Sequence, residues 1–156
     1  MVIFLLRHVE SKFNRYPLLK EYDCGVTEFG KEQALNISLP NIKFDEILIS
    51  PLKRVQETLL YLQIDKTINV KILNELREVK KDICDFYNNE EIIYESEKEI
   101  LLRIMYIKKY LNENINKNIL IIGHADLFWY LTSYVKDEER FGKWLENGEI
   151  FQYNLI

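Results

Sequence analysis

The stretch VIFLLRH, residues Val2–His8, begins with five consecutive apolar residues and ends abruptly at an arginine and a histidine. A continuous apolar run, rather than an alternating one, is typical of a strand that is buried on both faces of a parallel sheet. The polar pair has two explanations. Either the strand reaches the surface at that point, or it delivers a cation and an imidazole to one place in the fold.

The other histidine of the chain, His124, also follows a continuous apolar run, Ile119–Ile122. Arg54 lies about one helical turn beyond a further apolar run, Glu46–Ile49. Because the carboxyl ends of parallel strands meet at the same edge of a sheet, we expect these side chains to lie near Arg7 and His8. A lone histidine is more often structural, but two guanidinium groups and two imidazoles at one edge favour a dianion site, with phosphate as the natural ligand.

Strand patterns alternate with helix patterns along the chain. We expect strands at Val2–Leu6, Glu46–Ile49, Val70–Leu73, Ile119–Ile122 and residues 149–155. We expect helices from Thr27 to about Leu39, from Ser50 with Pro51 in the first position, from Ser96, over residues 126–136 and over residues 138–146. Residues 7–26 and 74–94 lack periodicity and are expected to form loops. This order predicts a three-layer α/β/α sandwich with a mostly parallel central sheet.

Composition places the chain among ordinary globular proteins. Its 156 residues, 47% of them apolar and 29% charged, suit a single domain over residues 1–156. A net charge of -4 argues against a general nucleic-acid surface, and the apolar runs are too short for a membrane span. The N-terminal run is also too short for a signal peptide, so we expect a cytoplasmic protein. Cys24 and Cys84 have no CxxC or metal-ligand spacing and are expected to be free thiols.

Five blocks of sequence, in order, resemble the segments of one known family. The block LLRHVESKFN at residues 5–14 resembles the signature RHG-x-T/S-x-x-N of the histidine phosphatase superfamily. The blocks GVTEFGKEQA, ILISPLKRVQET, ILIIGHADL and LENGEIF resemble four further segments of that family. The blocks extend from residue 5 to residue 151. The resemblance therefore implies a phosphoglycerate-mutase-like fold over nearly the whole chain.

The resemblance also implies a role for each polar residue at the sheet edge. It makes His8 the nucleophile that accepts a phosphoryl group, with Arg7, Asn14, Arg54 and His124 binding the phosphoryl oxygens. Phosphoryl transfer spreads negative charge over those oxygens, so several cationic groups fit the chemistry. The resemblance implies no cofactor and no metal, and the two histidines show no metal-ligand spacing.

The proton donor in this family is a carboxylic acid within an L-x-E element, and the sequence offers two candidates. Leu73-Asn74-Glu75 is one, and Leu76-Arg77-Glu78 is the other. We favour Glu78 as the catalytic acid, because LREVKKDICD then overlays the family's L-R-E and the G-x-W-E block that follows it. Within that block Asp82 stands where glycine is usual, and Cys84 stands where tryptophan is usual.

The implied function is hydrolysis of phosphomonoesters, or of protein phosphohistidine, through a phosphohistidine on His8. The alternatives are a mutase, although 156 residues leave no room for the extra segments of the family's mutases, and a phospho-ligand-binding module of weak or no activity. The expected partner is a phosphorylated small molecule or a phosphoprotein, contacted by residues 15–24 and 80–95, and neither nucleic acid nor membrane is expected. Val9 replaces the family's glycine after the histidine. Its side chain would either crowd the phosphate or make the adjoining backbone less permissive, and we expect a change in substrate fit.

Overall fold

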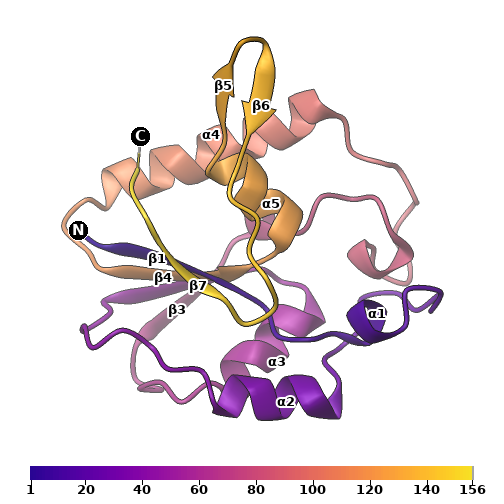
Figure 1. The fold of residues 1–156 in the computed structure, drawn as a ribbon, viewed down its shortest axis with the longest axis horizontal. Helices are drawn as coiled ribbons and strands as arrows, with labels where there is room; N and C mark the ends of the chain where they lie inside the picture. The colour runs from indigo at the N-terminus through magenta and orange to yellow at the C-terminus, as the bar shows by residue number, and fades with distance from the viewer. Residues whose placement is uncertain (156) are drawn as a thin grey trace.

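The computed structural model describes residues 1–155, which form three layers around a central sheet (Figure 1). The strand order is β3-β2-β4-β1-β7. These strands are β1 (Ile3–Arg7), β2 (Glu46–Ile49), β3 (Asn69–Ile72), β4 (Ile119–Gly123) and β7 (Ile150–Tyr153). β1, β2, β3 and β4 run parallel to one another, and β7 pairs with β1 in the antiparallel sense. The prediction of a mostly parallel central sheet is therefore confirmed.

The middle of the sheet places the two histidines side by side. Strand β4 lies between β1 and β2, and all of its residues are buried, which explains its continuous apolar sequence. In the register of β1 and β4, Arg7 lies opposite Gly123. The His8 backbone N–H donates to the Gly123 carbonyl oxygen at 2.9 Å. His8 and His124 therefore leave the sheet from adjacent positions on its carboxyl edge.

Helices cover both faces of the sheet. Helices α4 (Glu97–Glu113) and α5 (Ala125–Leu131) lie on one face, and α2 (Glu28–Leu35) and α3 (Lys53–Tyr61) lie on the other (Figure 1). Successive residues of β1 point to opposite faces, as a strand requires. Leu5 belongs to the apolar cluster under α4 and α5, and Leu6 belongs to the cluster against α3. This arrangement is the α/β/α sandwich that the sequence predicts.

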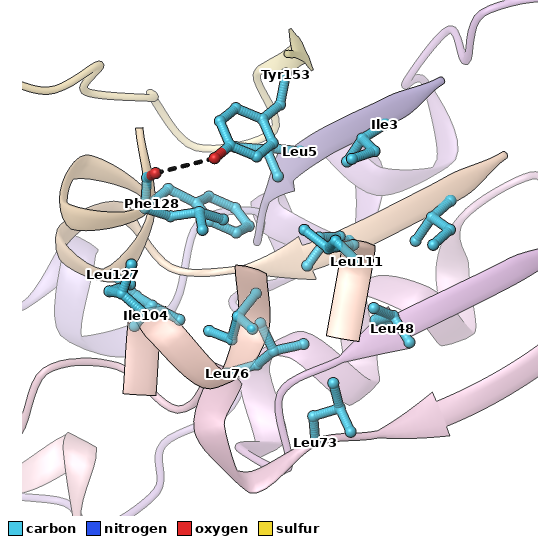
Figure 2. Close-up of a cluster of buried hydrophobic side chains, with 14 of the residues drawn as sticks. Ile3, Leu5, Leu48, Leu73, Leu76, Ile104, Leu111, Leu127, Phe128 and Tyr153 are labelled. Atoms are coloured by element: carbon cyan, nitrogen blue, oxygen red, sulfur yellow. Dashed lines mark hydrogen bonds between the residues drawn. The ribbon is translucent and has the colours of Figure 1, made fainter. Parts of the chain in front are cut away.

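The cluster under α4 and α5 is the larger part of the core. Figure 2 shows Leu111 of α4 and Phe128 of α5 near Leu5 and Leu48 of the central strands. The Tyr153 hydroxyl of β7 donates to a backbone carbonyl at the end of α5 at 3.2 Å. Within residues 1–155, no helix has both the length and the apolar character that crossing a bilayer requires.

Helix α4 begins and packs as its sequence predicts. Ser96 is the N-cap, and its side chain and that of Glu99 form a reciprocal capping box. Buried side chains lie along one face of the helix at intervals of four and three residues: Ile100, Ile104, Ile107 and Leu111.

Two other predicted helices differ from the structure at their ends. The helix that starts after the N-cap Thr27 ends at Leu35 rather than near Leu39, because the side-chain amide of Asn36 donates to the Glu32 carbonyl oxygen at 2.7 Å and closes the last turn. Helix α3 begins at Lys53, so the prediction of Ser50 as its N-cap is wrong. The Ser50 hydroxyl oxygen instead accepts the Leu52 backbone N–H and contacts His124.

The C-terminal region departs most from the prediction. Helix α5 covers Ala125–Leu131 rather than residues 126–136, and a hairpin of β5 (Tyr134–Lys136) and β6 (Glu139–Phe141) replaces the predicted helix over residues 138–146. The turn residues Asp137 and Glu138 have φ values of 51° and 68°. Because glycine and asparagine usually fill such positions, the hairpin leaves no ordinary turn signal in the sequence.

The two predicted loops contain short helices. Within residues 7–26, α1 (Lys12–Arg15) is capped by Ser11, whose hydroxyl accepts the Asn14 backbone N–H at 3.2 Å. Within residues 74–94, η1 (Asn74–Leu76) and η2 (Ile83–Asp85) are single turns of 3-10 helix. These turns escape periodicity arguments because they are shorter than one hydrophobic repeat.

Candidate active site

A cavity of about 200 Å³ opens at the carboxyl edge of the sheet. Its walls include five of the residues that the sequence predicts for the site: Arg7, His8, Asn14, Arg54 and Glu78. His124 is not among the residues that line the cavity, but its ring centroid lies 5.2 Å from that of His8, with the two ring planes at 62°. The explanation that the first strand simply reaches the surface does not hold, because His8 is 3% exposed and lines this cavity.

His8 is held in one tautomer. Its Nδ1 atom lies 2.7 Å from the Val9 carbonyl oxygen. A carbonyl oxygen only accepts, so Nδ1 carries the hydrogen and Nε2 keeps its lone pair. Burial lowers the pKa of His8 well below its ordinary value of 6.5, and the positive charges of Arg54 and Arg7 lower it further. At neutral pH the imidazole is therefore uncharged, with Nε2 available as a nucleophile.

His124 is oriented by Ser50 and retains one unpaired nitrogen. Its Nε2 atom lies 2.8 Å from the Ser50 hydroxyl oxygen. Its Nδ1 atom is buried and makes no hydrogen bond within residues 1–155. Burial is the main reason that the pKa of His124 lies well below 6.5, followed by the charge of Arg54. A buried polar atom without a partner is costly, so a ligand oxygen beside Nδ1 would supply what the protein leaves open.

Arg54 is fixed by the segment around η2. Its Nη1 donates to the Cys84 carbonyl oxygen and its Nη2 to Asp85 Oδ1, both at 2.9 Å. The other oxygen of Asp85 accepts the backbone N–H groups of Lys81 and Asp82, at 3.3 and 2.9 Å. The remaining donors of the guanidinium group are left for an anion in the cavity. Asp85 was not singled out from the sequence, although it stands at the acidic position of the G-x-W-E block.

Arg7 is also anchored at one point and unpaired at another. Its Nη1 donates to the Leu145 carbonyl oxygen at 2.8 Å, and its Nε is buried without a partner within the described residues. The guanidinium carbon lies 5.4 Å from the centroid of the Trp144 ring, which also lines the cavity. No motif in the sequence identifies Trp144 as part of the site. In both arginines, part of the guanidinium group is held by hydrogen bonds to the protein, and other N–H groups have no acceptor within the described residues.

Of the two candidates for the proton donor, Glu78 is the one that lines the cavity. Its Oε1 accepts the backbone N–H groups of Val79 and Leu127, at 2.9 and 3.0 Å. Burial raises the pKa of Glu78 to about 7, and the negative charges of Asp126 and Asp85 add to the rise against the opposing charge of Arg54. A carboxyl group with a pKa near the working pH is suited to donate and accept a proton. The alternative candidate, Glu75, does not line the cavity. Its backbone carbonyl oxygen accepts a hydrogen bond from Arg103 Nη1.

Asn14 lies at the cavity with its oxygen already engaged. Asn14 Oδ1 accepts the Ser11 backbone N–H at 3.0 Å and the side-chain amide of Asn147 at 3.1 Å. The amide nitrogen of Asn14 is therefore the group that remains for a phosphoryl oxygen. This arrangement agrees with the position predicted for Asn14 and adds the reason for its orientation.

Of the two effects considered for Val9, crowding of the phosphate does not occur. Val9 is fully buried and packs against Val26 and Ala34, away from the cavity. Adjacent residues of an extended chain point to opposite sides, so His8 faces the cavity and Val9 faces the helix layer. The Val9 backbone serves the site instead, because its carbonyl oxygen holds His8 and its N–H donates to Thr58 Oγ1 at 3.2 Å.

The rim of the cavity carries charges of both signs. Lys81 Nζ lies 2.7 Å from Asp126 Oδ2, and Asp82 lies beside them. Phe13 of α1 and Trp144 add aromatic surface to the same rim. Among residues 1–155, no group of three or more histidine, cysteine, aspartate or glutamate side chains is arranged to hold a metal ion.

Comparison with known proteins identifies the family. The model of the histidine phosphatase superfamily (branch 1) matches residues 3–101, and the chain belongs to that superfamily. No curated protein matched in a search with the whole sequence.

Solved structures with the same fold extend the comparison. A candidate alpha-ribazole-5'-P phosphatase from Escherichia coli is 25% identical, with a TM-score of 0.70 over 84% of this chain and 77% of the other. The alpha-ribazole phosphatase from Shigella flexneri is 21% identical, with a TM-score of 0.69 over 93% and 96%. The protein histidine phosphatase SixA, complexed with tungstate, is 18% identical, with a TM-score of 0.61 over 97% and 86%. These likenesses confirm the phosphoglycerate-mutase-like fold.

Proposed function

We propose that this protein is a phosphatase that hydrolyses phosphomonoesters or protein phosphohistidine through a covalent phosphohistidine on His8. The observation that carries the proposal is the meeting of three features in one cavity. These are a neutral imidazole with a free Nε2, two anchored arginines with donors to spare, and a carboxyl group with a pKa of about 7. Family membership and the phosphatases among the structural neighbours support the same reaction.

The first chemical step transfers the phosphoryl group to His8. Arg7 and Arg54 bind the phosphoryl oxygens and stabilise the charge that spreads over them in the transition state. His8 Nε2 forms a bond to phosphorus while the bond from phosphorus to the leaving oxygen breaks. Protonated Glu78 gives its proton to that oxygen and becomes a carboxylate.

The second step returns the enzyme to its starting state. A water molecule attacks the phosphorus atom of phosphohistidine, and the Glu78 carboxylate takes a proton from that water. The bond between phosphorus and Nε2 breaks, and inorganic phosphate and neutral His8 are restored. Splitting hydrolysis into two displacements lowers the barrier of each.

The substrate is proposed as a class rather than a single compound. The cavity of about 200 Å³ is lined by Phe13, Trp144 and the Lys81–Asp126 pair, which are the groups available to contact the leaving group. The relatives act, by their names, on alpha-ribazole phosphate and on a protein histidine. Both kinds of leaving group suit an open rim, so phosphorylated metabolites and phosphohistidine proteins belong in the same screen.

Labelling with a phosphoryl donor tests the covalent intermediate. We expect wild-type protein to acquire an acid-labile label and His8→Ala to acquire none, because the attacking nitrogen is gone. His124→Asn should still be labelled, at a lower rate, because His124 binds oxygens and is not attacked. Persistence of an acid-labile label in His8→Ala, or hydrolysis that strictly requires an added divalent ion, would contradict the mechanism.

A further inference from the structure

The turn before β7 packs against the segment that carries His8. The Glu149 backbone N–H donates to the Glu146 carbonyl oxygen at 3.0 Å and closes the turn. Gly148 is its third residue and has a φ of 73°, a conformation that favours glycine. The Gly148 N–H donates to the Arg7 carbonyl oxygen, and the Arg7 N–H donates to the Glu149 carbonyl oxygen, both at 3.1 Å. The turn is therefore fixed against the end of β1.

Asn147, the second residue of this turn, contacts two members of the site through one amide nitrogen. Its Nδ2 donates to the His8 carbonyl oxygen at 3.0 Å and to Asn14 Oδ1 at 3.1 Å. A carbonyl oxygen only accepts hydrogen bonds, so the His8 contact requires that the N–H₂ group of Asn147 lies on this side. The Asn147 backbone carbonyl oxygen accepts the side-chain amide of Gln33 at 2.9 Å, which holds the turn from α2. Asn147 therefore presents a donor to Asn14.

This donor helps to fix which end of the Asn14 amide remains for a ligand. Asn14 Oδ1 also accepts the Ser11 backbone N–H at 3.0 Å and the Ser11 hydroxyl at 2.9 Å. In the reversed orientation, the Asn14 N–H₂ group would face the N–H groups of Ser11 and Asn147, and its oxygen would be left for the ligand. A neutral acceptor and an anionic acceptor repel each other. The orientation of the amide thus determines whether Asn14 attracts or repels an oxyanion in the cavity that it lines.

The contact with Asn147 also connects distant segments. Ser11 and Asn14 belong to the same short helical turn, so the contacts between them move together with α1. Helix α1 has four residues and buries none of them, so apolar packing contributes little to its position. Among the hydrogen bonds to Asn14 Oδ1 within residues 1–155, the one from Asn147 comes from 133 positions away in sequence. That bond ties the Asn14 side chain to the turn that also holds the His8 backbone.

We propose that Asn147 is a positioning residue of the oxyanion site, whose amide group joins the His8 backbone to the Asn14 side chain and turns the Asn14 N–H₂ group toward a bound oxyanion. Asn147 does not line the cavity and acts through Asn14. The effect on turnover rests on the proposed phosphatase function, whereas the effect on oxyanion binding does not.

A double-mutant cycle on oxyanion binding tests the proposal. Calorimetric titration with tungstate, the oxyanion in the SixA structure, is carried out on the wild-type protein, Asn14→Ala, Asn147→Ala and the double variant. We expect Asn14→Ala to weaken binding about tenfold, through loss of a hydrogen bond to a charged ligand, and Asn147→Ala to weaken it about fivefold, through loss of an uncharged one. In the Asn14→Ala background, Asn147→Ala should weaken binding by less than about twofold, because its effect passes through Asn14.

A matched control and a direct probe of the amide accompany the cycle. Asn154→Ala changes an exposed asparagine outside the cavity and should leave the affinity unchanged. In the ¹⁵N-labelled wild-type protein, tungstate should shift the side-chain amide signals of Asn14, which are assigned by their absence in Asn14→Ala. The shift should be smaller in Asn147→Ala. If that variant fails to fold, Asn147→Ser takes its place, since serine is common in turns and its single O–H serves only one of the two acceptors.

Tungstate binding involves no turnover, so these measurements decide the role of Asn147 whether or not the protein hydrolyses phosphomonoesters. Losses of affinity that add in the double variant would overturn the proposal, because Asn147 would then act independently of Asn14. An unchanged affinity in Asn147→Ala, or no binding of tungstate by the wild-type protein, would overturn it as well.

Discussion

Glu78 shows how the surroundings of one carboxyl group set its chemistry. The side chain is 6% exposed, and its oxygens accept backbone N–H groups from the segment after η1 and from the start of α5. Those donors favour the ionised form, but burial and the negative charge of Asp126 outweigh them and bring the pKa to about 7. The group therefore carries a proton through the mildly acidic range and loses it as the pH rises through neutrality.

The pH profile of hydrolysis follows from this pKa. With a poor leaving group, we expect the wild-type rate to fall as the pH rises through about 7, because Glu78 must hold its proton. His8 contributes no limb near neutrality, since its pKa lies well below 6.5. Glu78→Gln should lower kcat by about 10²–10⁴-fold and remove the limb. With an aryl phosphate, whose leaving group needs no proton, the formation of phosphohistidine should be much less affected.

A matched variant makes this prediction specific. Glu75→Gln changes the neighbouring candidate carboxyl group, which lies outside the cavity, and should keep both the rate and the pH limb. If the limb survives in Glu78→Gln, or disappears in Glu75→Gln, the proton donor is not Glu78. The measurement is kcat as a function of pH for both substrates.

Asp85 carries the buried charge that balances Arg54. Their side chains are 2% and 4% exposed, and Asp85 also accepts two backbone N–H groups. Asp85→Asn presents an amide N–H₂ group either to Arg54 or to those donors, and one set of contacts is lost. Because a buried charge without a partner is costly, we expect a loss of stability on the order of 3 kcal/mol.

Chemical denaturation with and without inorganic phosphate measures this effect. Phosphate should recover part of the lost stability of Asp85→Asn, since the anion gives Arg54 a new partner. Asp137→Asn, in the exposed turn between β5 and β6, is the control and should change stability little. An equal loss of stability in the two variants, or no gain in stability when phosphate is added to Asp85→Asn, would show that Asp85 does not balance the charge of Arg54.

At the scale of elements, α2 supports the segment that follows the nucleophile. The Glu10 carbonyl oxygen accepts the Thr27 backbone N–H at 3.0 Å, and the Glu10 N–H donates to the Gln33 side chain at 3.0 Å. Gly30 faces this segment so closely that an added Cβ would overlap the Glu10 carbonyl oxygen. The glycine of the block GVTEFGKEQA is therefore explained by contact rather than by backbone conformation.

Gly30→Ala tests this contact. Alanine at a solvent-exposed helix position gains about 1 kcal/mol over glycine. Overlap with a backbone oxygen costs more, so we expect a net loss of about 1–3 kcal/mol, together with reduced activity because the chain after His8 must move. Glu32→Ala, on the exposed side of α2, is the control and should be nearly neutral. Thermal unfolding measures the stability of both variants. If Gly30→Ala is more stable than the wild type, an added Cβ does not overlap the Glu10 carbonyl oxygen.

Elements also mark the limit of prediction from sequence. Strands β1, β2 and β4 lie within a residue of their predicted ranges, because burial on both faces demands continuous apolar runs that no other element shares. The β5–β6 hairpin was predicted as a helix, because its exposed residues show no alternation and its turn uses Asp137 and Glu138 without glycine. Where neither burial nor turn chemistry constrains the residues, the pattern carries little information.

At the scale of the whole molecule, a chain with a net charge of -4 places two arginines in one cavity at the edge of its sheet. Arg7 and Arg54 come from opposite sides of β4, one at the end of β1 and the other in the first turn of α3. An anion that binds both arginines connects these two parts of the fold. Because only the folded chain brings them together, the anion should stabilise folding.

Thermal unfolding with added tungstate measures this stabilisation. At a concentration one hundred times the Kd, we expect a gain of about 2.7 kcal/mol, which raises the Tm by several degrees. Arg54→Gln should lose most of the gain. Arg140→Gln, in the hairpin and outside the cavity, should keep it. A gain of the same size in Arg54→Gln would mean that the anion binds elsewhere.

The sequence by itself determined the layered α/β fold and the identity of the principal polar residues, because strand burial and the strand-end positions of His8 and His124 are local properties of the chain. It favoured Glu78 over Glu75 without excluding either, and it left open which of two effects the Val9 side chain has. Only the tertiary structure decided that Glu78 reaches the cavity and that Asp85 fixes Arg54. The physical reason is that each of these contacts joins segments far apart in sequence, whose approach depends on how loops pack at the edge of the sheet.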